Sequence, residues 1–432
     1  MSLVSEIDSY LKELFPIARS ITGLGNRESL KILQRIAPLQ VEEYKSGKSV
    51  YDWIIPDEWN VKDAWIKDSF GNKIIDYKEC NIHIVGYSIP VHTTMNFKEL
   101  RPKLFYDNRI PDSIPYRTSY YHKDYGFCVT KKQYEKLKSI NTPLEIKIES
   151  ELDPNGSMTI GELLIPGASK QEILISTYFC HPQLANDNLS GFLMTAFLAR
   201  KLLEKKDLKY SYRIVWVPET IGAISYCSVN EKQMKDIDMG LVITTVGGSG
   251  SFGYKQSFNI EHPINRIVES TFMDSSIDFI KYQWDIHGSD ERQYSSKAFS
   301  INTITISKDK YYEYPQYHTS SDDLSLVNGS QIYDSLKIYL QLIEKFENRV
   351  LYKNTNPYCE AFLSKHDLYP KEGGTLRPKL KGKSEVDVIL WLLFLCDGSM
   401  SVEDISLKIG IDKEIINDFS IRLENKGLLK KV

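Results

Sequence analysis

Four apolar segments of strand length, separated by segments of helical character, constrain the fold more than any other feature of this chain. They are QEILISTYF, YRIVWVP, LVITTV and SINTITIS, all between residues 149 and 348. The segments LSGFLMTAFLARKLLEKK and QIYDSLKIYLQLIEKFE place apolar residues with the helical period. Strands this apolar are buried on both faces, so we predict an α/β fold: a mostly parallel sheet with helices on both faces.

The pattern changes along the chain and predicts three domains. The main domain comprises residues 1–40 and 149–350, interrupted by a β-rich insertion at residues 41–148, where short strand-like runs alternate with turn residues. Residues 351–382 have the composition of a linker, marked by the glycine pair in KEGGTLRPKLKGK. Residues 383–432 show the order helix, turn, helix, turn, helix, which resembles a winged-helix module.

Charge and cysteine usage restrict the partners and the compartment. The 432 residues carry a formal net charge of -3, so no strong basic field favours nucleic acid or an anionic membrane. The C-terminal module holds more acidic than basic residues, so we predict that it contacts a protein partner or a second copy of the chain instead of DNA. The cysteines form no CxxC pair, and the sequence shows neither a signal peptide nor an apolar run near the roughly 18 residues that span a bilayer. We expect a cytoplasmic protein with reduced thiols and no membrane association.

The segment STYFCHPQLANDNLSG is the sharpest chemical signal. His181 follows an apolar strand directly, and Asp187 comes six residues later, before a predicted helix. Zinc accepts a neutral imidazole nitrogen and a carboxylate oxygen. Open α/β sheets also place their sites at the carboxyl ends of strands. A single histidine near an aspartate is, however, more often a surface hydrogen bond than a metal site.

The same arrangement recurs after two further strands. Glu219 follows YRIVWVP, and His318 follows the strand SINTITIS within EYPQYHTSSDDL. The ends of parallel strands share one edge of a sheet, so we expect these groups to converge. Glu219 suits a general base, or else an acid at a helix N-terminus. Asp322 and Asp323 either orient His318 from behind or cap a polar loop.

A fourth segment, DIHGSDERQY at residues 285–294, is dense in ionisable groups. It contains His287, Asp290, Glu291 and Arg292 around a glycine. It is either a solvated turn or a recognition site. In the second case the acids would bind an α-amine and Arg292 a carboxylate.

The motifs ANDNLSG, PETIG, GSDE and YHTSSDDL resemble, in this order, those of zinc exopeptidases of the clan that holds bacterial leucyl-type aminopeptidases and glutaminyl cyclases. The resemblance covers roughly residues 150–350. It implies that His181, Asp187 and His318 bind metal and that Glu219 is the general base. Together with ELFPIARSITG, SIPVHTT, SYYHKDYGFC and the C-terminal module, the chain resembles a bacterial family of aminopeptidase-like proteins with a β-rich insertion.

Some positions depart from the pattern of the clan. Thr220 follows the general base where the clan often has a second glutamate, and Thr244 or Thr245 stands where an aspartate is usual. Both missing acids are usually metal ligands in the clan, so we expect one zinc ion, with water as its fourth ligand, and doubt a second. Glu291 replaces the histidine of the clan's SDH-like segment.

The resemblance implies a zinc-dependent hydrolase that cleaves peptide or other amide bonds, of the aminopeptidase type. Asp290 and Tyr317 would contact a peptide or aminoacyl substrate. The alternatives are an effector-binding regulator with a winged helix, a peptidase relative that binds peptides without cleaving them, and an amide hydrolase or cyclase for non-peptide substrates.

Overall fold

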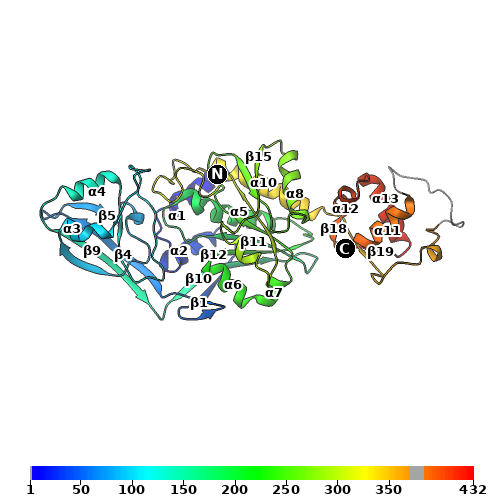
Figure 1. The fold of residues 1–432 in the computed structure, drawn as a ribbon, viewed down its shortest axis with the longest axis horizontal. Coiled ribbons are helices and arrows are strands. Elements are labelled where there is room, and N and C mark those ends of the chain that lie inside the picture. Colours follow the sequence, from blue (N-terminus) through cyan, green and yellow to red (C-terminus); the bar gives the residue numbers. More distant parts are fainter. Residues whose placement is uncertain (1, 370–383) are drawn as a thin grey trace. The chain divides into compact units, whose positions relative to one another are not determined.

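The computed structural model describes residues 2–369 and 384–432. These residues form two compact units, Met1–Leu342 and Ile343–Val432 (Figure 1). The first unit contains the main sheet and the insertion, and the second contains the predicted C-terminal module. Among the described residues, no helix is both long enough and apolar enough to cross a membrane.

The main sheet has eight strands within the described part of the first unit. In spatial order they are β1 (Gln40–Lys45), β10 (Ser157–Ile165), β12 (Ser211–Val217), β11 (Glu172–Tyr178), β13 (Met239–Ile243), β16 (Asn302–Ser307), β14 (Phe252–Lys255) and β15 (Phe279–Tyr282). The central strands β12, β11, β13 and β16 run parallel. Antiparallel pairings add β10 and β1 on one side and β14 on the other. The predicted α/β architecture is confirmed, with antiparallel strands flanking the parallel centre.

Helices cover this sheet on both faces. Every residue of β12, β13 and β16 is buried, and successive side chains of a strand point to opposite faces, so both faces must be covered. The helices of this unit outside the insertion are α1 (Leu3–Leu14), α2 (Leu24–Leu33), α5 (Gly191–Leu203), α6 (Ile221–Val229), α7 (Glu231–Lys235), α8 (Pro263–Asp274), the short α9 (Glu291–Tyr294) and α10 (Gly329–Glu347), which extends past its boundary. Helix α5 packs against the central strands β11, β12 and β13.

The insertion forms a second, antiparallel sheet in the order β5 (Lys73–Asp76), β4 (Glu58–Lys67), β9 (Leu144–Asp153) and β6 (Val91–Met95). Two short strand pairs accompany it, β2 (Ser49–Val50) with β3 (Trp53–Ile54) and β7 (Leu104–Phe105) with β8 (Phe127–Cys128). Its helical segments are η1 (Asn81–His83), α3 (Phe97–Leu100), η2 (Arg101–Lys103) and α4 (Lys131–Lys138). Strand β1, predicted inside the insertion, pairs with β10 of the main sheet, so the chain leaves that sheet only after β1.

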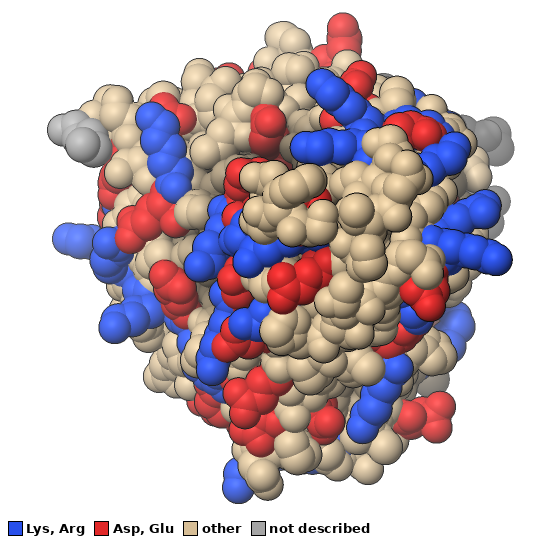
Figure 2. Space-filling view, turned by 90° about the vertical axis from the view of Figure 1, so that its left-hand side faces the viewer, with Lys and Arg blue, Asp and Glu red and all other residues tan. Residues whose placement is uncertain are grey.

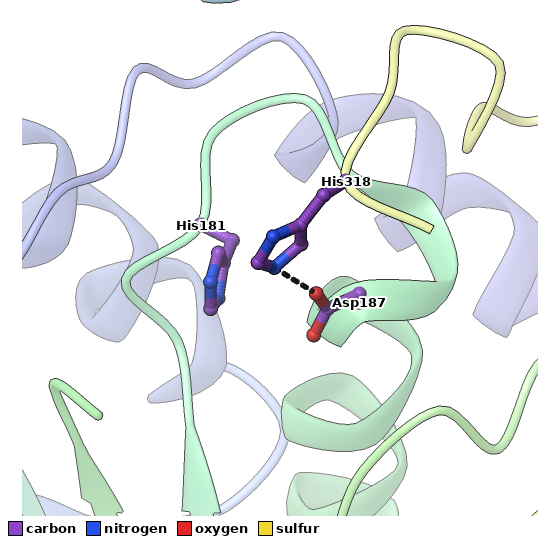
Figure 3. Close-up of side chains that lie close together, drawn as sticks. All are labelled: His181, Asp187 and His318. Carbon is purple, nitrogen blue, oxygen red and sulfur yellow. Dashed lines mark ion pairs between the residues drawn. The ribbon is translucent and has the colours of Figure 1, made fainter. Parts of the chain in front are cut away.

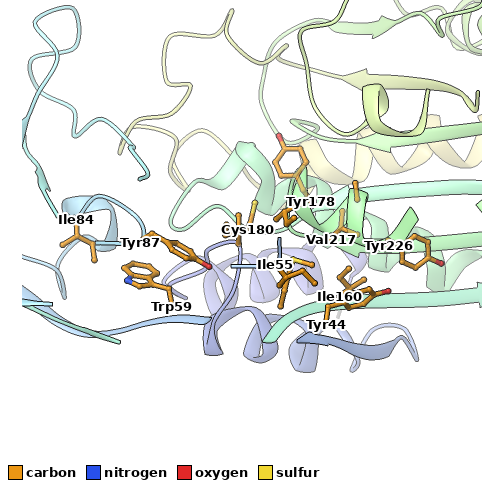
Figure 4. Packing of buried hydrophobic residues seen from close by; sticks show 14 of the residues in the cluster. Tyr44, Ile55, Trp59, Ile84, Tyr87, Ile160, Tyr178, Cys180, Val217 and Tyr226 are labelled. Atoms are coloured by element: carbon orange, nitrogen blue, oxygen red, sulfur yellow. The ribbon is translucent and has the colours of Figure 1, made fainter. Parts of the chain in front are cut away.

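The two sheets of the first unit share one hydrophobic core (Figure 4). Trp59 and Tyr87 of the insertion stack with ring centroids 5.6 Å apart, and their cluster continues to Tyr178 and Val217 of the main sheet. The hydroxyl groups of Thr22 and Tyr87 are 2.6 Å apart, and Thr22 also accepts a hydrogen bond from the Trp59 amide. Continuous burial of this kind holds the insertion against the strand ends that carry the candidate site.

Charged side chains of both signs are interspersed on the face of the molecule at the α4 end (Figure 2). The ion pairs of the insertion include Lys131 with Glu135 at 3.1 Å and Lys147 with Glu149 at 2.6 Å. Neighbouring opposite charges of this kind cancel much of each other's field.

The second unit is a small module of helices and a three-stranded antiparallel sheet. Its helices are η4 (Leu363–His366), α11 (Glu385–Leu395), α12 (Val402–Ile409) and α13 (Lys413–Asn425), and its sheet has the order β18 (Asp397–Ser401), β17 (Leu351–Asn354), β19 (Leu429–Lys431). Strand β17 and helix η4 fall in residues 351–382, which the sequence predicts as a linker. The reason is that the residues of β17 are mostly buried and pair with both neighbouring strands. Residues 370–382 of that range lie outside the described part.

Candidate metal centre

Three loops at the carboxyl ends of parallel strands carry the candidate site. His181 follows β11, Glu219 follows β12, and His318 lies in the loop after β16. Strands β11 and β12 are direct neighbours, with Tyr178 opposite Val217, so their ends lie side by side. The convergence expected from strand direction is therefore present in the structure.

His181, Asp187 and His318 form a compact cluster (Figure 3). One ligand atom from each residue lies within 4.8 Å of the others. The two imidazole ring centroids are 5.4 Å apart, and His318 Nε2 lies 3.0 Å from Asp187 Oδ2. Asp187 Oδ2 is nevertheless buried without a hydrogen-bond partner among the described residues. Two imidazoles facing an unsatisfied carboxylate oxygen fit a divalent cation such as zinc.

Asp187 is held by Asp322 through the backbone. Asp187 belongs to η3 (Ala185–Ser190), an irregular turn before α5 in which Asp187 and Asn188 have non-helical backbone angles. The Asp322 carboxylate accepts hydrogen bonds from the Asn186 amide at 2.6 Å and the Asp187 amide at 2.9 Å. It also accepts one from the Tyr314 hydroxyl. Of the two roles that the sequence left open, orienting His318 or capping a polar loop, the structure does not show the first, because both carboxylate oxygens of Asp322 accept from the η3 backbone and Tyr314.

Burial and charge set the ionisation of the cluster. Burial lowers the pKa of His181 to about 4, so its imidazole is neutral at pH 7 and its nitrogen is free to bind a metal. Burial acts to raise the pKa of Asp187, but the neighbouring histidines and the Tyr178 hydroxyl outweigh it and lower that pKa to about 2. The cluster therefore offers one carboxylate and a neutral His181 near neutral pH.

Glu219 faces this cluster from the end of β12. Its Oε2 lies 3.9 Å from His181 Nε2, and its Oε1 accepts a hydrogen bond of 2.7 Å from the Ser289 hydroxyl. Burial, reinforced by the negative charge of Asp187, raises the pKa of Glu219 to about 7. A carboxylate with this pKa takes up and releases a proton easily near neutral pH.

Two pockets meet at Glu219 and His318, and we name them by their walls. The insertion pocket has a volume of about 400 Å³ and is lined by His181 and by insertion residues that include Phe105, Tyr116 and Tyr120. The loop pocket has a volume of about 140 Å³ and is lined by residues that include Ser289, Arg292 and Tyr317. A substrate bound across Glu219 and His318 would thus have one part in each pocket.

The segment 285–294 serves both structure and site. Asp290 is fully buried and accepts the Thr220 amide, and Glu291 is fully buried beside Lys255 at 3.0 Å. Neither acid lines the two pockets, so neither is placed to bind an amine there. His287 is exposed and likewise lines neither pocket, whereas Arg292 lines the loop pocket.

Tyr317 stacks directly on His318, with ring centroids 3.9 Å apart and an interplanar angle of 13°. It also lines the loop pocket. Of the two threonines that stand where the clan has an acid, Thr244 lies 2.6 Å from the Tyr178 hydroxyl, whose other contact is with Asp187.

Sequence reasoning missed two residues that hold the histidines. The Tyr116 amide donates to the His318 carbonyl at 2.8 Å, and its ring lies 5.3 Å and 5.2 Å from the rings of His181 and His318. The Arg19 guanidinium is buried and donates from Nε to the His181 carbonyl at 3.0 Å. No sequence pattern around Tyr116 or Arg19 predicts either contact. The motif ELFPIARSITG, which contains Arg19, belongs to the family resemblance but indicates no role for the arginine.

Comparison with known proteins covers nearly the whole chain. A family model described as "Domain of unknown function (DUF4910)" matches residues 8–349, and a winged helix-turn-helix model matches residues 350–431. A protein of Clostridium acetobutylicum named "Putative polysaccharide biosynthesis protein with aminopeptidase-like domain" is 41% identical over 427 residues, covering 99% of this chain and 96% of that protein.

Solved structures show the same fold. A crystal structure of a "putative peptidase" from Clostridium acetobutylicum matches with a TM-score of 0.80 and 39% identity, covering 99% of this chain and 96% of the other. BSAP, a zinc aminopeptidase from Bacillus subtilis, matches with a TM-score of 0.56 and 13% identity, over 80% of this chain and 94% of its own. The first unit therefore has an aminopeptidase-like fold.

Proposed function

The chain belongs to the family described as "Domain of unknown function (DUF4910)", and on that premise we propose that it is a zinc-dependent hydrolase of amide bonds, of the aminopeptidase type. The aminopeptidase-like fold supports a peptidase-type hydrolase. The proposals of zinc dependence and of amide-bond cleavage rest on one observation, the cluster of His181, Asp187 and His318 beside Glu219.

The residues present suit one zinc ion. His181, Asp187 and His318 would hold it, because they combine two imidazoles with a buried carboxylate oxygen that lacks a hydrogen bond among the described residues. Bound zinc supplies a Lewis acid that polarises a carbonyl and lowers the pKa of a water molecule. The threonines at positions 244 and 245 offer no carboxylate for a second ion, which agrees with a single-metal site.

Glu219 is the proposed general base. The Ser289 hydroxyl occupies Oε1 and fixes the carboxylate, which leaves Oε2 on the side of His181 to accept a proton from the attacking water. The same oxygen then donates this proton to the nitrogen of the leaving amine. Tyr317 covers one face of His318 and limits the access of bulk water to it.

Elemental analysis and hydrolysis assays test the proposal together. Purified protein is expected to hold about one zinc per chain and to hydrolyse members of a panel of aminoacyl amides, N-acyl amino acids and dipeptides. Absence of stoichiometric zinc would favour an effector-binding regulator. Bound zinc and bound peptide without cleavage of any substrate would favour a non-catalytic peptide-binding relative.

A further inference from the structure

Arg292 lies at the edge of the candidate centre and forms no ion pair with any residue that the structure describes. Its Nε–H group is buried and donates to no acceptor within residues 2–369 and 384–432. A buried guanidinium nitrogen without a partner is costly, and such groups are usually satisfied by a ligand or by water.

Neither of the two acids that precede Arg292 in sequence forms an ion pair with it in the described part of the chain. Asp290 Oδ1 accepts the Thr220 amide, and burial raises the pKa of Asp290 well above its usual range. Glu291 lies 3.0 Å from Lys255 Nζ and accepts the Tyr311 hydroxyl at 3.2 Å. The charge of Arg292 opposes the rise in the pKa of Asp290, but the arginine has no ion pair among the described residues and lines the loop pocket.

The loop pocket limits what can meet that charge. Its volume is about 140 Å³, and its wall contains Glu219 and His318 as well as Arg292. One water molecule occupies about 30 Å³ in the liquid, so the pocket has room for a group of only a few non-hydrogen atoms. A planar carboxylate matches the guanidinium fork in shape and charge.

We propose that Arg292 binds a substrate carboxylate in the loop pocket, so that the enzyme prefers amides with a free carboxylate close to the scissile bond. This inference rests on the proposed amide hydrolysis and adds the substrate class. The carboxylate is either the α-carboxylate of a small C-terminal residue or the side chain of an acidic residue. The remainder of the substrate occupies the insertion pocket, which has almost three times the volume.

Two substrate pairs separate the sources of the carboxylate. Alanylalanine is compared with alanylalaninamide, and aspartyl p-nitroanilide with asparaginyl p-nitroanilide, using zinc-loaded protein. One pair is expected to show a preference in kcat/KM of about tenfold or more for the acid, as for a charge-assisted hydrogen bond. Arg292→Gln should remove that preference, so that the acid and its neutral counterpart are cleaved with similar kcat/KM. The control is Arg109→Gln, which removes an arginine whose side chain is 88% exposed and paired with Asp107.

A binding measurement tests whether Arg292 binds a carboxylate, and it does not require the protein to cleave a substrate. Titration calorimetry on metal-free protein compares N-acetylalanine with N-acetylalaninamide, and succinamate with succinamide, so that zinc cannot capture the carboxylate. Wild-type protein should bind one of the two acids more tightly than its amide, and Arg292→Gln should bind both members of that pair equally.

Equal binding of acids and amides by the wild type, or a preference that survives in Arg292→Gln, would overturn the assignment. If the protein cleaves no amide, the proposed function fails, and calorimetry still decides whether Arg292 binds carboxylates. If cleavage occurs with no preference for acids in either pair, only the assignment of Arg292 fails.

Discussion

His318 Nε2 lies 3.0 Å from Asp187 Oδ2, yet that oxygen has no hydrogen bond among the described residues. The two side chains come from loops after different strands, and neighbours hold each of them. Asp322 fixes the turn that contains Asp187, and Tyr116 fixes the backbone of His318. An imidazole nitrogen and a carboxylate oxygen that separate parts of the chain hold this close together are suitably placed to share one bound cation.

Removal of His318 is expected to abolish stabilisation by zinc. Because a ligand that binds only the folded protein stabilises it by about 2.7 kcal/mol at a concentration of 100 Kd, zinc should raise the melting temperature of metal-free wild-type protein. His318→Ala should show no such rise in a thermal-shift assay. His92→Ala is the matched control, since the His92 side chain is 61% exposed and lies in the insertion. An unchanged zinc response in His318→Ala would contradict the assigned site.

Glu219→Gln is expected to keep zinc and lose turnover. Glutamine preserves the size of the side chain and still has an oxygen to accept from Ser289, but it cannot take a proton. The rate of amide hydrolysis should fall by about 10²-fold to 10⁴-fold, with zinc content near that of the wild type. Turnover close to the wild-type rate would show that another group acts as the base.

Asp322→Asn is expected to weaken zinc binding although this residue touches no metal. Its two oxygens accept the Asn186 and Asp187 amides, and an asparagine NH₂ group would place a donor against one of them. The affinity for zinc should drop by about tenfold to a hundredfold in competition with a chelator. Asp323→Asn is the control, because Asp323 is partly exposed and its carboxylate accepts hydrogen bonds from Ser325, far from the η3 turn in sequence. Equal zinc affinities of the two variants would argue against this positioning role.

The pair of Arg27 and Glu58 is expected to contribute stability that depends on pH. Hydrogen bonds from Arg27, opposed by burial, lower the pKa of Glu58 from 4.5 to about 2. A depressed pKa stabilises the folded state above the unfolded value of 4.5, and this contribution disappears as the pH falls towards 2. Glu58→Gln should therefore cost about 1–3 kcal/mol at pH 7, measured by urea unfolding, and progressively less below pH 4.

Glu149→Gln serves as the control for this pH experiment. Glu149 pairs with Lys147 at the surface with its side chain 45% exposed, and such pairs contribute little. A loss of stability in Glu58→Gln that is as large at pH 2.5 as at pH 7 would contradict the assignment to ionised Glu58.

The strand ends were predictable because their signal is local. An apolar run ends, a polar ligand-type residue follows, and parallel strands bring their carboxyl ends to one edge. These rules sufficed to bring His181, Glu219 and His318 together. They left the role of Asp322 open, because the two backbone amides that its carboxylate accepts lie in a segment far away in the sequence.

The sequence by itself determined the α/β architecture, the winged-helix module and the group of residues expected to hold a metal. Periodicity and strand direction depend on residues that are close together in the sequence, so they can be recognised from the sequence alone. Only the tertiary structure decided that β1 joins the main sheet and that β17 belongs to the second unit. It also decided that Arg292 lines a small pocket and has no ion pair within the described part of the chain. Such outcomes depend on which distant groups pack together and satisfy one another's hydrogen bonds, and no local pattern encodes that choice.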